Sequence, residues 1–200
     1  MIIGISGRIG VGKDTLGEMI QKLIKGSEIK SYADKLRTVA EVLTGIPAEK
    51  FKDRNFKNSK MPIEWGWYGD EEDPMTVREF LQELGTDAIR DSLNPNAWVN
   101  ALMSDYVCEE LNEGETCIYP NWIITDVRFP NEAEAIKKVG GIVIRLNRKA
   151  ATKNSHDSEL AMEGWGDYNY TFDNDGDLED LQAFANQVVN NLNNKENEQM

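Results

Sequence analysis

Residues 2–15 read Ile-Ile-Gly-Ile-Ser-Gly-Arg-Ile-Gly-Val-Gly-Lys-Asp-Thr and give the strongest indication of the fold class. The apolar, β-branched run at 2–6 predicts a buried parallel strand. The apolar residues over 13–25 recur at helical spacing, which predicts an amphipathic helix. The connection between them follows the phosphate-loop pattern G-x-x-x-x-G-K, which ends at Gly12 and Lys13. Strand, glycine-rich loop and helix in this order indicate an α/β protein that binds phosphate groups.

The loop residues predict a donor-phosphate site and a magnesium site. Gly10 and Gly12 allow the backbone to turn so that its N–H groups meet phosphate oxygens at the positive end of the helix. Lys13 can reach the β- and γ-phosphates. Asp14 stands where Ser or Thr usually meets Mg²⁺, and Thr15 follows. Both carry oxygen ligands of the kind that Mg²⁺ prefers, with Asp14 binding directly or through water.

The remaining pattern alternates strands with helices, which predicts an open, mostly parallel five-stranded sheet with helices on both faces, in three layers. Such sheets bind ligands at the carboxyl ends of their strands. We expect further strands at about 28–32, 121–127, 142–146 and 169–172, and further helices at about 34–44, 76–92, 96–111 and 130–140 and after a cap at Asp177. Thr76 and Glu79 are expected to form a capping box at the start of the helix over 76–92.

The chain reads as one domain over 1–192 with a polar tail at 193–200. Periodicity is poor over 46–75, where aromatic residues and prolines gather, and this segment is interpreted as an insertion. The following helical part covers about 76–111. The polar stretch 147–166 is predicted to be a lid loop.

Composition excludes several classes of protein. The net charge of −13 argues against binding of a nucleic-acid polymer, although the first 60 residues hold 12 basic and 7 acidic side chains. Two cysteines and one histidine argue against a disulfide framework and a zinc site, so we expect free thiols in a reducing compartment. No signal peptide or membrane span of about 18 to 20 apolar residues is visible. The sequence predicts a soluble, cytoplasmic protein.

A second chemical signal lies at the end of the strand 121–127. Asp126 is an acidic residue at a strand terminus, where it can serve a metal or an acceptor, or simply cap the next helix. Arg128 follows two residues later, and its guanidinium can hold a phosphate through two hydrogen bonds.

Several segments occur in an order that resembles the deoxynucleoside monophosphate kinases of the viral type, within the P-loop nucleoside monophosphate kinases. The resemblance covers about 1–190 and is weakest over 46–75. The segments are Gly-Lys-Asp-Thr at 12–15, Tyr-Ala-Asp-Lys-Leu-Arg at 32–37, Val-Arg-Glu-Phe-Leu-Gln-Glu-Leu-Gly-Thr-Asp at 77–87, Asn-Ala-Trp-Val at 96–99, Thr-Asp-Val-Arg-Phe-Pro-Asn-Glu at 125–132 and Asn-Asp-Gly at 174–176.

The resemblance implies a P-loop NTPase fold and transfer of the γ-phosphoryl group of ATP to a deoxynucleoside 5′-monophosphate, with Mg²⁺. It implies small-molecule substrates, and a homodimer is the family expectation for assembly. Lys13, Asp126 and Arg128 are the implied catalytic residues. The ATP site would comprise Gly10, Gly12, Lys13, Asp14, Thr15, Arg148 and Asn174, and the acceptor site Arg37, Arg78, Gln82, Gly85, Thr86, Trp98, Asp126, Arg128 and Glu132, with Arg8 and Arg54 as second-rank candidates. The turn Asn174-Asp175-Gly176 would border the adenine of ATP.

Several of these side chains also have an interpretation that involves structure alone, without binding of a ligand. Trp98 fits a core position, Gln82 a helix surface, Glu132 a favourable first-turn carboxylate, and Asn174 an ordinary turn. His156, with Lys153, would contact phosphate from the lid or be an exposed loop residue.

Three other functions are weighed against this one, and the residues argue against the second. A kinase of the same fold could act on another small acceptor such as dephospho-coenzyme A. A GTP-binding switch would need a guanine-reading Asn-Lys-x-Asp, which Asn194-Lys195-Glu196 in the tail does not match. A catalytically silent nucleotide-binding module is the third.

Overall fold

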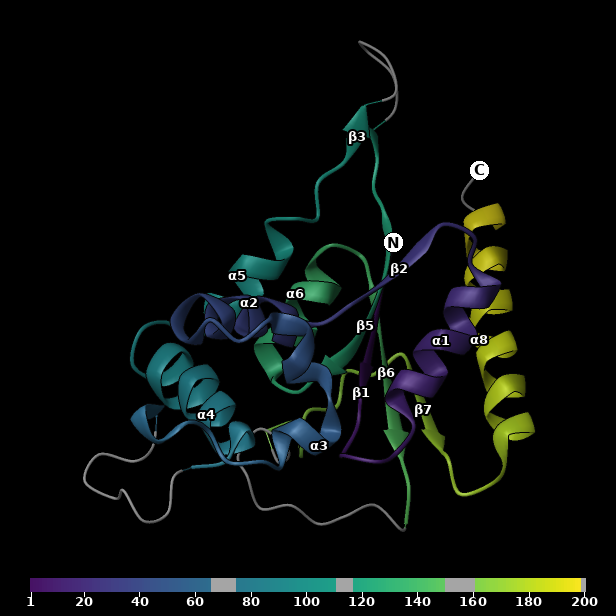
Figure 1. Cartoon of the computed structure of the whole chain (residues 1–200). Helices are drawn as coiled ribbons and strands as arrows, with labels where there is room; N and C mark the ends of the chain where they lie inside the picture. Colours follow the sequence, from purple (N-terminus) through teal and green to yellow (C-terminus); the bar gives the residue numbers. More distant parts are fainter. Residues whose placement is uncertain (66–74, 111–116, 150–160, 199–200) are drawn as a thin grey trace. The chain divides into compact units, whose positions relative to one another are not determined.

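The computed structural model describes residues 1–65, 75–110, 117–149 and 161–198 (Figure 1). Contacts divide the chain into two compact units, one formed by Met1–Ser31 with Met103–Met200 and the other by Tyr32–Leu102. The first unit carries the phosphate loop. The second holds most of what the sequence assigns to the insertion and to the acceptor-binding helices.

The first unit is built on a five-stranded sheet in the order β2-β5-β1-β6-β7. Every neighbouring pair in it is parallel, which confirms the predicted α/β class. The buried strand β1 lies at the centre because it is apolar on both faces. The strands are β1 (Ile2–Ser6), β2 (Ser27–Lys30), β5 (Asn121–Val127), β6 (Ile142–Asn147) and β7 (Tyr170–Asp173).

Helices cover both faces of this sheet, which confirms the three-layer arrangement. α1 (Lys13–Leu23) and α8 (Leu178–Glu198) lie side by side (Figure 1), and their apolar residues share one core with Ile3 and Ile5 of β1. α6 (Pro130–Lys138) covers the other face, where a Cβ added at Gly4 would lie 2.6 Å from Cδ1 of Ile136. α8 is longer than expected, since it continues as far as Glu198 into the stretch predicted as a polar tail.

The segment after residue 103 differs from the prediction. The helix expected over 96–111 ends early, as α5 (Ala97–Met103), and β3 (Glu109–Glu110) then pairs antiparallel with β4 (Cys117–Ile118). The structure also bonds Cys108 to Cys117 as a disulfide, so the expectation of free thiols is wrong.

Aromatic packing explains why this segment leaves the helix. The ring of Tyr106 stacks on Tyr119 at 5.1 Å between centroids and meets Trp122 of β5 edge-on at 5.0 Å. These partners lie beyond the hairpin in sequence, so their packing with Tyr106 cannot be read from the helical spacing of 96–111.

The second unit is helical and has its own apolar core. Phe51, Met61, Val77 and Phe80 are buried together. The predicted capping box is present, because the Thr76 N–H donates to Glu79 at 2.7 Å and the Glu79 N–H donates to the Thr76 hydroxyl at 3.2 Å. The elements are α2 (Tyr32–Thr44), η1 (Ala48–Lys52), α3 (Arg54–Lys57), η2 (Ile63–Trp65), α4 (Val77–Gln82), η3 (Glu83–Asp91) and α5.

The helix predicted over 76–92 is present but not uniform. α4 is an ordinary α-helix, whereas η3 is wound as a π-helix. Part of the predicted insertion, 66–74, lies outside the described residues. Among the described helices, none has both the length and the apolar character needed to cross a membrane.

Candidate active site

The phosphate loop joins β1 to α1 and depends on glycine at two positions. Gly10 and Gly12 have φ angles of 80° and 100°, in the left-handed region that side chains with a Cβ rarely adopt. Gly12 also serves as the N-cap of α1. The loop therefore delivers the chain to the positive end of a helix, the arrangement that favours a bound anion.

Lys13, the first residue of α1, reaches back over the loop. Its ammonium Nζ donates to the carbonyl oxygens of Gly7 and Arg8, at 2.6 and 2.9 Å. The charge of this side chain is thus held at the mouth of the loop. A phosphoryl group bound in the loop would therefore be within reach of the Lys13 ammonium.

The first turn of α1 also carries the two predicted magnesium ligands. Asp14 is exposed and Thr15 is half-buried. No cluster of three or more His, Cys, Asp or Glu side chains suited to a metal occurs in the described part of the chain. Mg²⁺ in phosphoryl-transfer sites takes one or two protein ligands and completes its shell with water and substrate phosphates. Two oxygen-bearing side chains beside an anion-binding loop fit that requirement.

Asp126 lies near the carboxyl end of β5, in the same unit as the loop. Its Oδ2 accepts a 2.6 Å hydrogen bond from the hydroxyl of Ser31, the residue after β2. β5 pairs with both β2 and β1. A carboxylate and the phosphate loop are therefore placed at the same edge of one sheet, where parallel α/β proteins bind ligands.

Glu132 shapes the turn that carries Arg128. Its side chain is 3% exposed, and Oε2 accepts the backbone N–H groups of Arg128 at 2.7 Å and Phe129 at 3.1 Å. This supports the first-turn interpretation, since the carboxylate satisfies N–H groups where α6 begins. Glu132 thereby fixes the backbone of Arg128.

A basic cavity of about 260 Å³ lies beside the loop. Glu163, which the sequence analysis did not single out, forms an ion pair with Arg8 of the loop. No sequence pattern connects these two residues, which lie 155 positions apart. The cavity is lined by Arg8, Val11, Arg145, Leu146, Asn147, Arg148, Lys149 and Glu163.

Ion pairing also organises the start of the predicted lid. Lys149 lies 3.0 Å from Asp175, and its backbone N–H donates to the same carboxylate at 2.8 Å. The hydrogen bond with Asp175 raises the pKa of Lys149, and the hydrogen bonds from Lys149 lower the pKa of Asp175. Of the predicted lid residues, Arg148 is exposed. Lys153 and His156 lie outside the described residues.

Asn174 does not sit in an ordinary exposed turn. It is 6% exposed, and its Nδ2 donates a 2.8 Å hydrogen bond to the carbonyl of Val11 within the phosphate loop. Its backbone N–H donates to the carbonyl of Asn147 at 2.9 Å. The predicted ATP-site residue is thus in direct contact with the loop.

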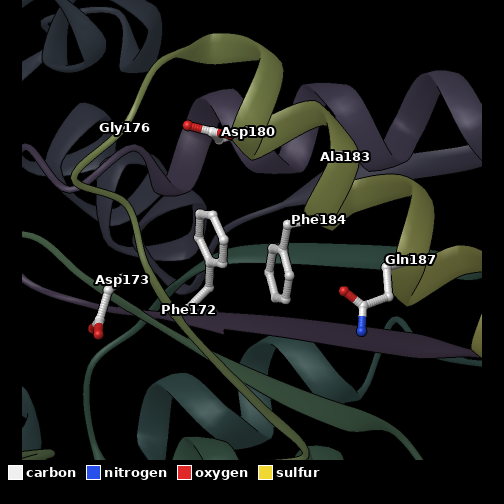
Figure 2. A pocket seen from close by; sticks show the side chains of 7 residues that line it. All are labelled: Phe172, Asp173, Gly176, Asp180, Ala183, Phe184 and Gln187. Atoms are coloured by element: carbon white, nitrogen blue, oxygen red, sulfur yellow. The ribbon is translucent and has the colours of Figure 1, made fainter.

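A second cavity, of about 380 Å³, lies between β7 and the start of α8 (Figure 2). The rings of Phe172 and Phe184 stack there with centroids 4.4 Å apart, and Asp180 and Gln187 reach the same cavity from α8.

In the second unit, two predicted phosphate-binding arginines are held by polar partners. Arg37 pairs with Asp34 one turn earlier in α2, at 2.6 Å, and its side chain is only 11% exposed. Arg78 on α4 donates to Oδ1 of Asn58 at 3.2 Å. Gln82 follows Arg78 by four residues in α4, so the two side chains lie on one face of that helix, and Gln82 is half-buried.

Gly85 and Thr86 lie in the π-helix η3, where close packing restricts the backbone. A Cβ at Gly85 would lie 2.9 Å from Leu36 of α2. The indole N–H of Trp98 donates to the Gly85 carbonyl at 2.8 Å, and Trp98 is 8% exposed. Trp98 thus takes the core position that was its structural interpretation. Sequence reasoning did not single out Arg90 of η3, which is 6% exposed and donates to the Pro95 carbonyl at 3.2 Å.

A P-loop between a parallel strand and a helix, with an aspartate at the end of the neighbouring strand of the sheet, is the arrangement of a P-loop nucleotide-binding protein. Residues 51–184 match the sequence profile of deoxynucleotide monophosphate kinase, and the chain belongs to that family. It is an enzyme of the kinase class.

Two viral relatives agree with the family assignment. A protein of Acanthamoeba polyphaga mimivirus, whose name carries the same kinase class, is 28% identical over 97% of each chain. The deoxynucleotide monophosphate kinase of Enterobacteria phage T4 is 32% identical over 55% of this chain and 44% of its own. Among solved structures, the shikimate kinase of Bacteroides thetaiotaomicron has a TM-score of 0.44 at 16% identity, covering 96% of this chain and 98% of its own.

Proposed function

We propose that this enzyme transfers the γ-phosphoryl group of ATP to a deoxynucleoside 5′-monophosphate. The bond between the γ-phosphorus and the oxygen that leaves with ADP breaks, and an oxygen of the acceptor phosphate forms the new bond. The products are ADP and a deoxynucleoside diphosphate. The observation that carries the proposal is the phosphate loop with Lys13, on the same sheet edge as Asp126.

The donor site is assigned to the first unit. The loop amides at Gly10 and Gly12 and the first turn of α1 would bind the phosphates of ATP. The basic cavity beside the loop supplies positive charge, with Arg148 on its wall. Lys13 would stabilise the charge that moves with the transferring group. Asn174 belongs to this site through its contact with the loop.

The acceptor site is assigned to two sets of residues. Asp126 and Arg128 at the end of β5 would position the acceptor phosphate, with Glu132 fixing the Arg128 backbone. Arg37, Arg78 and Gln82 would supply phosphate and base contacts. Gly85 and Thr86 would allow close approach of the nucleotide, and Trp98 would support them through its bond to the Gly85 carbonyl.

Asp14 and Thr15 would hold Mg²⁺. When bound, Mg²⁺ neutralises charge on the β- and γ-phosphates. No proton base is required, because the acceptor phosphate is already anionic near neutral pH. Closure over the substrates would exclude water from the phosphoryl group.

Steady-state kinetics with a panel of acceptors tests this function. The panel contains dAMP, dCMP, dGMP, dTMP, the corresponding ribonucleotides and dephospho-coenzyme A, each with MgATP. We expect turnover with at least one deoxynucleoside monophosphate. Turnover with dephospho-coenzyme A alone would favour the other small-acceptor kinase, and nucleotide binding without any transfer would favour a silent module.

The cellular setting follows from the substrates. Deoxynucleoside monophosphates and ATP occur in the cytoplasm, and we place the enzyme there, as a homodimer that binds neither nucleic-acid polymers nor membranes. Sedimentation of the purified protein tests the dimer.

A further inference from the structure

Asn174 connects the turn after β7 to the phosphate loop, 163 positions earlier in the chain. The Nδ2···O distance to Val11 is 2.8 Å, and both residues are buried, with exposed fractions of 6% and 1%. A hydrogen bond between two buried groups is worth more than one at the surface, since no water replaces it when it is lost.

The peptide that Asn174 holds lies in the middle of the loop. The peptide between Val11 and Gly12 is trans, as are all peptides in the part of the chain that the structure describes. In a trans peptide the C=O and the following N–H lie in one plane and point in opposite directions. Holding the Val11 carbonyl toward Asn174 therefore makes the Gly12 N–H point away from Asn174.

The same contact limits how the loop can relax. A Cβ placed on Gly12 would lie 2.8 Å from Nδ2 of Asn174, so the amide lies directly against the glycine. Gly12 has a φ of 100°, a conformation that only glycine adopts at low cost. Without a partner for the Val11 carbonyl, a glycine peptide of this kind can rotate and turn its N–H away from a phosphate.

Asn174 is also held in place itself. Its backbone N–H donates to the Asn147 carbonyl at 2.9 Å at the end of β6, and the side chain of Asn147 donates to Asp173 at 3.1 Å. The side-chain amide is thus presented to the loop from two strand ends of the sheet. This is the support that a positioning residue needs.

We propose that Asn174 is a positioning residue for the phosphate loop: it orients the Gly12 N–H toward the phosphates of the donor and does not itself read the adenine base. The proposal rests on the proposed function, because it assigns the donor phosphates to this loop. It differs from the adenine-side role that the turn 174–176 suggests from sequence.

Binding of tripolyphosphate and of adenosine separates the two roles. Tripolyphosphate reports on the loop and adenosine on the base, and both can be titrated into the full-length protein by calorimetry. Asn174→Ala removes the side-chain N–H that donates to the Val11 carbonyl and adds no charge. For this variant we expect the affinity for tripolyphosphate to fall about tenfold while the affinity for adenosine is unchanged. For Asn174→Asp, whose carboxylate repels the Val11 carbonyl, we expect a larger loss of tripolyphosphate affinity, about a hundredfold.

Asn190→Asp provides the matched control for the change in net charge, since Asn190 is exposed on α8. It should leave both affinities at their wild-type values. Asn174 variants that lose adenosine affinity while keeping tripolyphosphate would overturn the proposal in favour of a base contact. An equal loss of both ligands, as from a general loss of fold, would also count against it. Failure of the unmodified enzyme to bind tripolyphosphate would instead contradict the proposed function.

Discussion

The hydroxyl of Ser31 donates a 2.6 Å hydrogen bond to Oδ2 of Asp126, so the ends of two adjacent parallel strands fix the direction of this carboxylate. A carboxylate held in this way does not need to reorganise when substrate binds, which is the condition for efficient electrostatic catalysis.

Asp126→Asn should lower kcat about a hundredfold or more, because the amide keeps the size of the side chain but loses its charge. Ser31→Ala should cost less than about tenfold, since it removes only one hydrogen bond to the carboxylate. Phosphotransfer measured at saturating ATP and acceptor checks both. Asp167→Asn, a surface change near Lys137, is the control. Equal kcat for Asp126→Asn and the control would remove Asp126 from the mechanism.

Lys13→Met should reduce kcat by about 10²–10³-fold, because the neutral side chain cannot offset charge on the transferring phosphoryl group. The comparison is Lys22→Met, since Lys22 is exposed on the last turn of the same helix and should tolerate the change. Thermal unfolding should show that both variants are folded. Full phosphotransfer by Lys13→Met would contradict the proposed mechanism.

The parts of the fold that the sequence predicts correctly are those governed by local pattern. The run 2–15 predicts a strand, a loop and a helix because glycine positions and apolar spacing act within a few residues. Thr76 and Glu79 form the expected capping box for the same reason. Asp126 and Arg128 could be singled out because a strand end in a parallel sheet has a known place relative to the ligand.

The parts that could not be predicted depend on contacts between distant residues. Helical spacing over 96–111 is outweighed by the packing of Tyr106 on Tyr119 and by the pairing of β3 with β4. The π-helical winding of η3 leaves no periodic signal distinct from an α-helix. The contacts of Glu163 with Arg8 and of Asn174 with Val11 join residues more than 150 positions apart.

Glu163→Gln should strengthen ATP binding about two- to fivefold at low ionic strength, because the change removes the negative charge that pairs with Arg8 in the basic cavity. The gain should shrink as salt is added, since exposed charges are screened. Fluorescence titration with a labelled ATP analogue at two salt concentrations checks this. Glu134→Gln, at an exposed position on α6, is the control, because it changes the net charge of the protein by the same amount as Glu163→Gln. Weaker binding by Glu163→Gln would show that the ion pair supports the site.

The pair formed by Lys149 and Asp175 should stay charged throughout the neutral range. The pKa of Asp175 is lowered, so any stability from its charge is present above its unfolded pKa and is lost only as pH falls through the lower, folded pKa. The pKa of Lys149 is raised, so its charge persists at high pH. Asp175→Asn should therefore change ATP affinity by the same factor at pH 5, 6, 7 and 8. A factor that varies across this range would show that another titrating group acts through Asp175.

Gly17→Ala should both destabilise the protein and slow catalysis, because α1 packs against β5 at this residue. A Cβ there would lie 2.5 Å from Cγ2 of Thr125, the neighbour of Asp126. The better helix propensity of alanine adds about 1 kcal/mol to the free energy of unfolding, whereas overpacking in a buried contact lowers it by about 1–3 kcal/mol. The added methyl group also pushes the helix that carries Lys13 away from the strand that carries Asp126.

Calorimetric unfolding and kcat, measured on the same preparations, check the two effects of Gly17→Ala together. Asn190→Ala is the control, since it also introduces alanine into a helix but at an exposed position of α8 outside the site. The control should stay within about 0.5 kcal/mol of the unmodified enzyme, with an unchanged kcat. If Gly17→Ala were as stable and as active as the control, the close contact of α1 with Thr125 could not be what aligns Lys13 with Asp126.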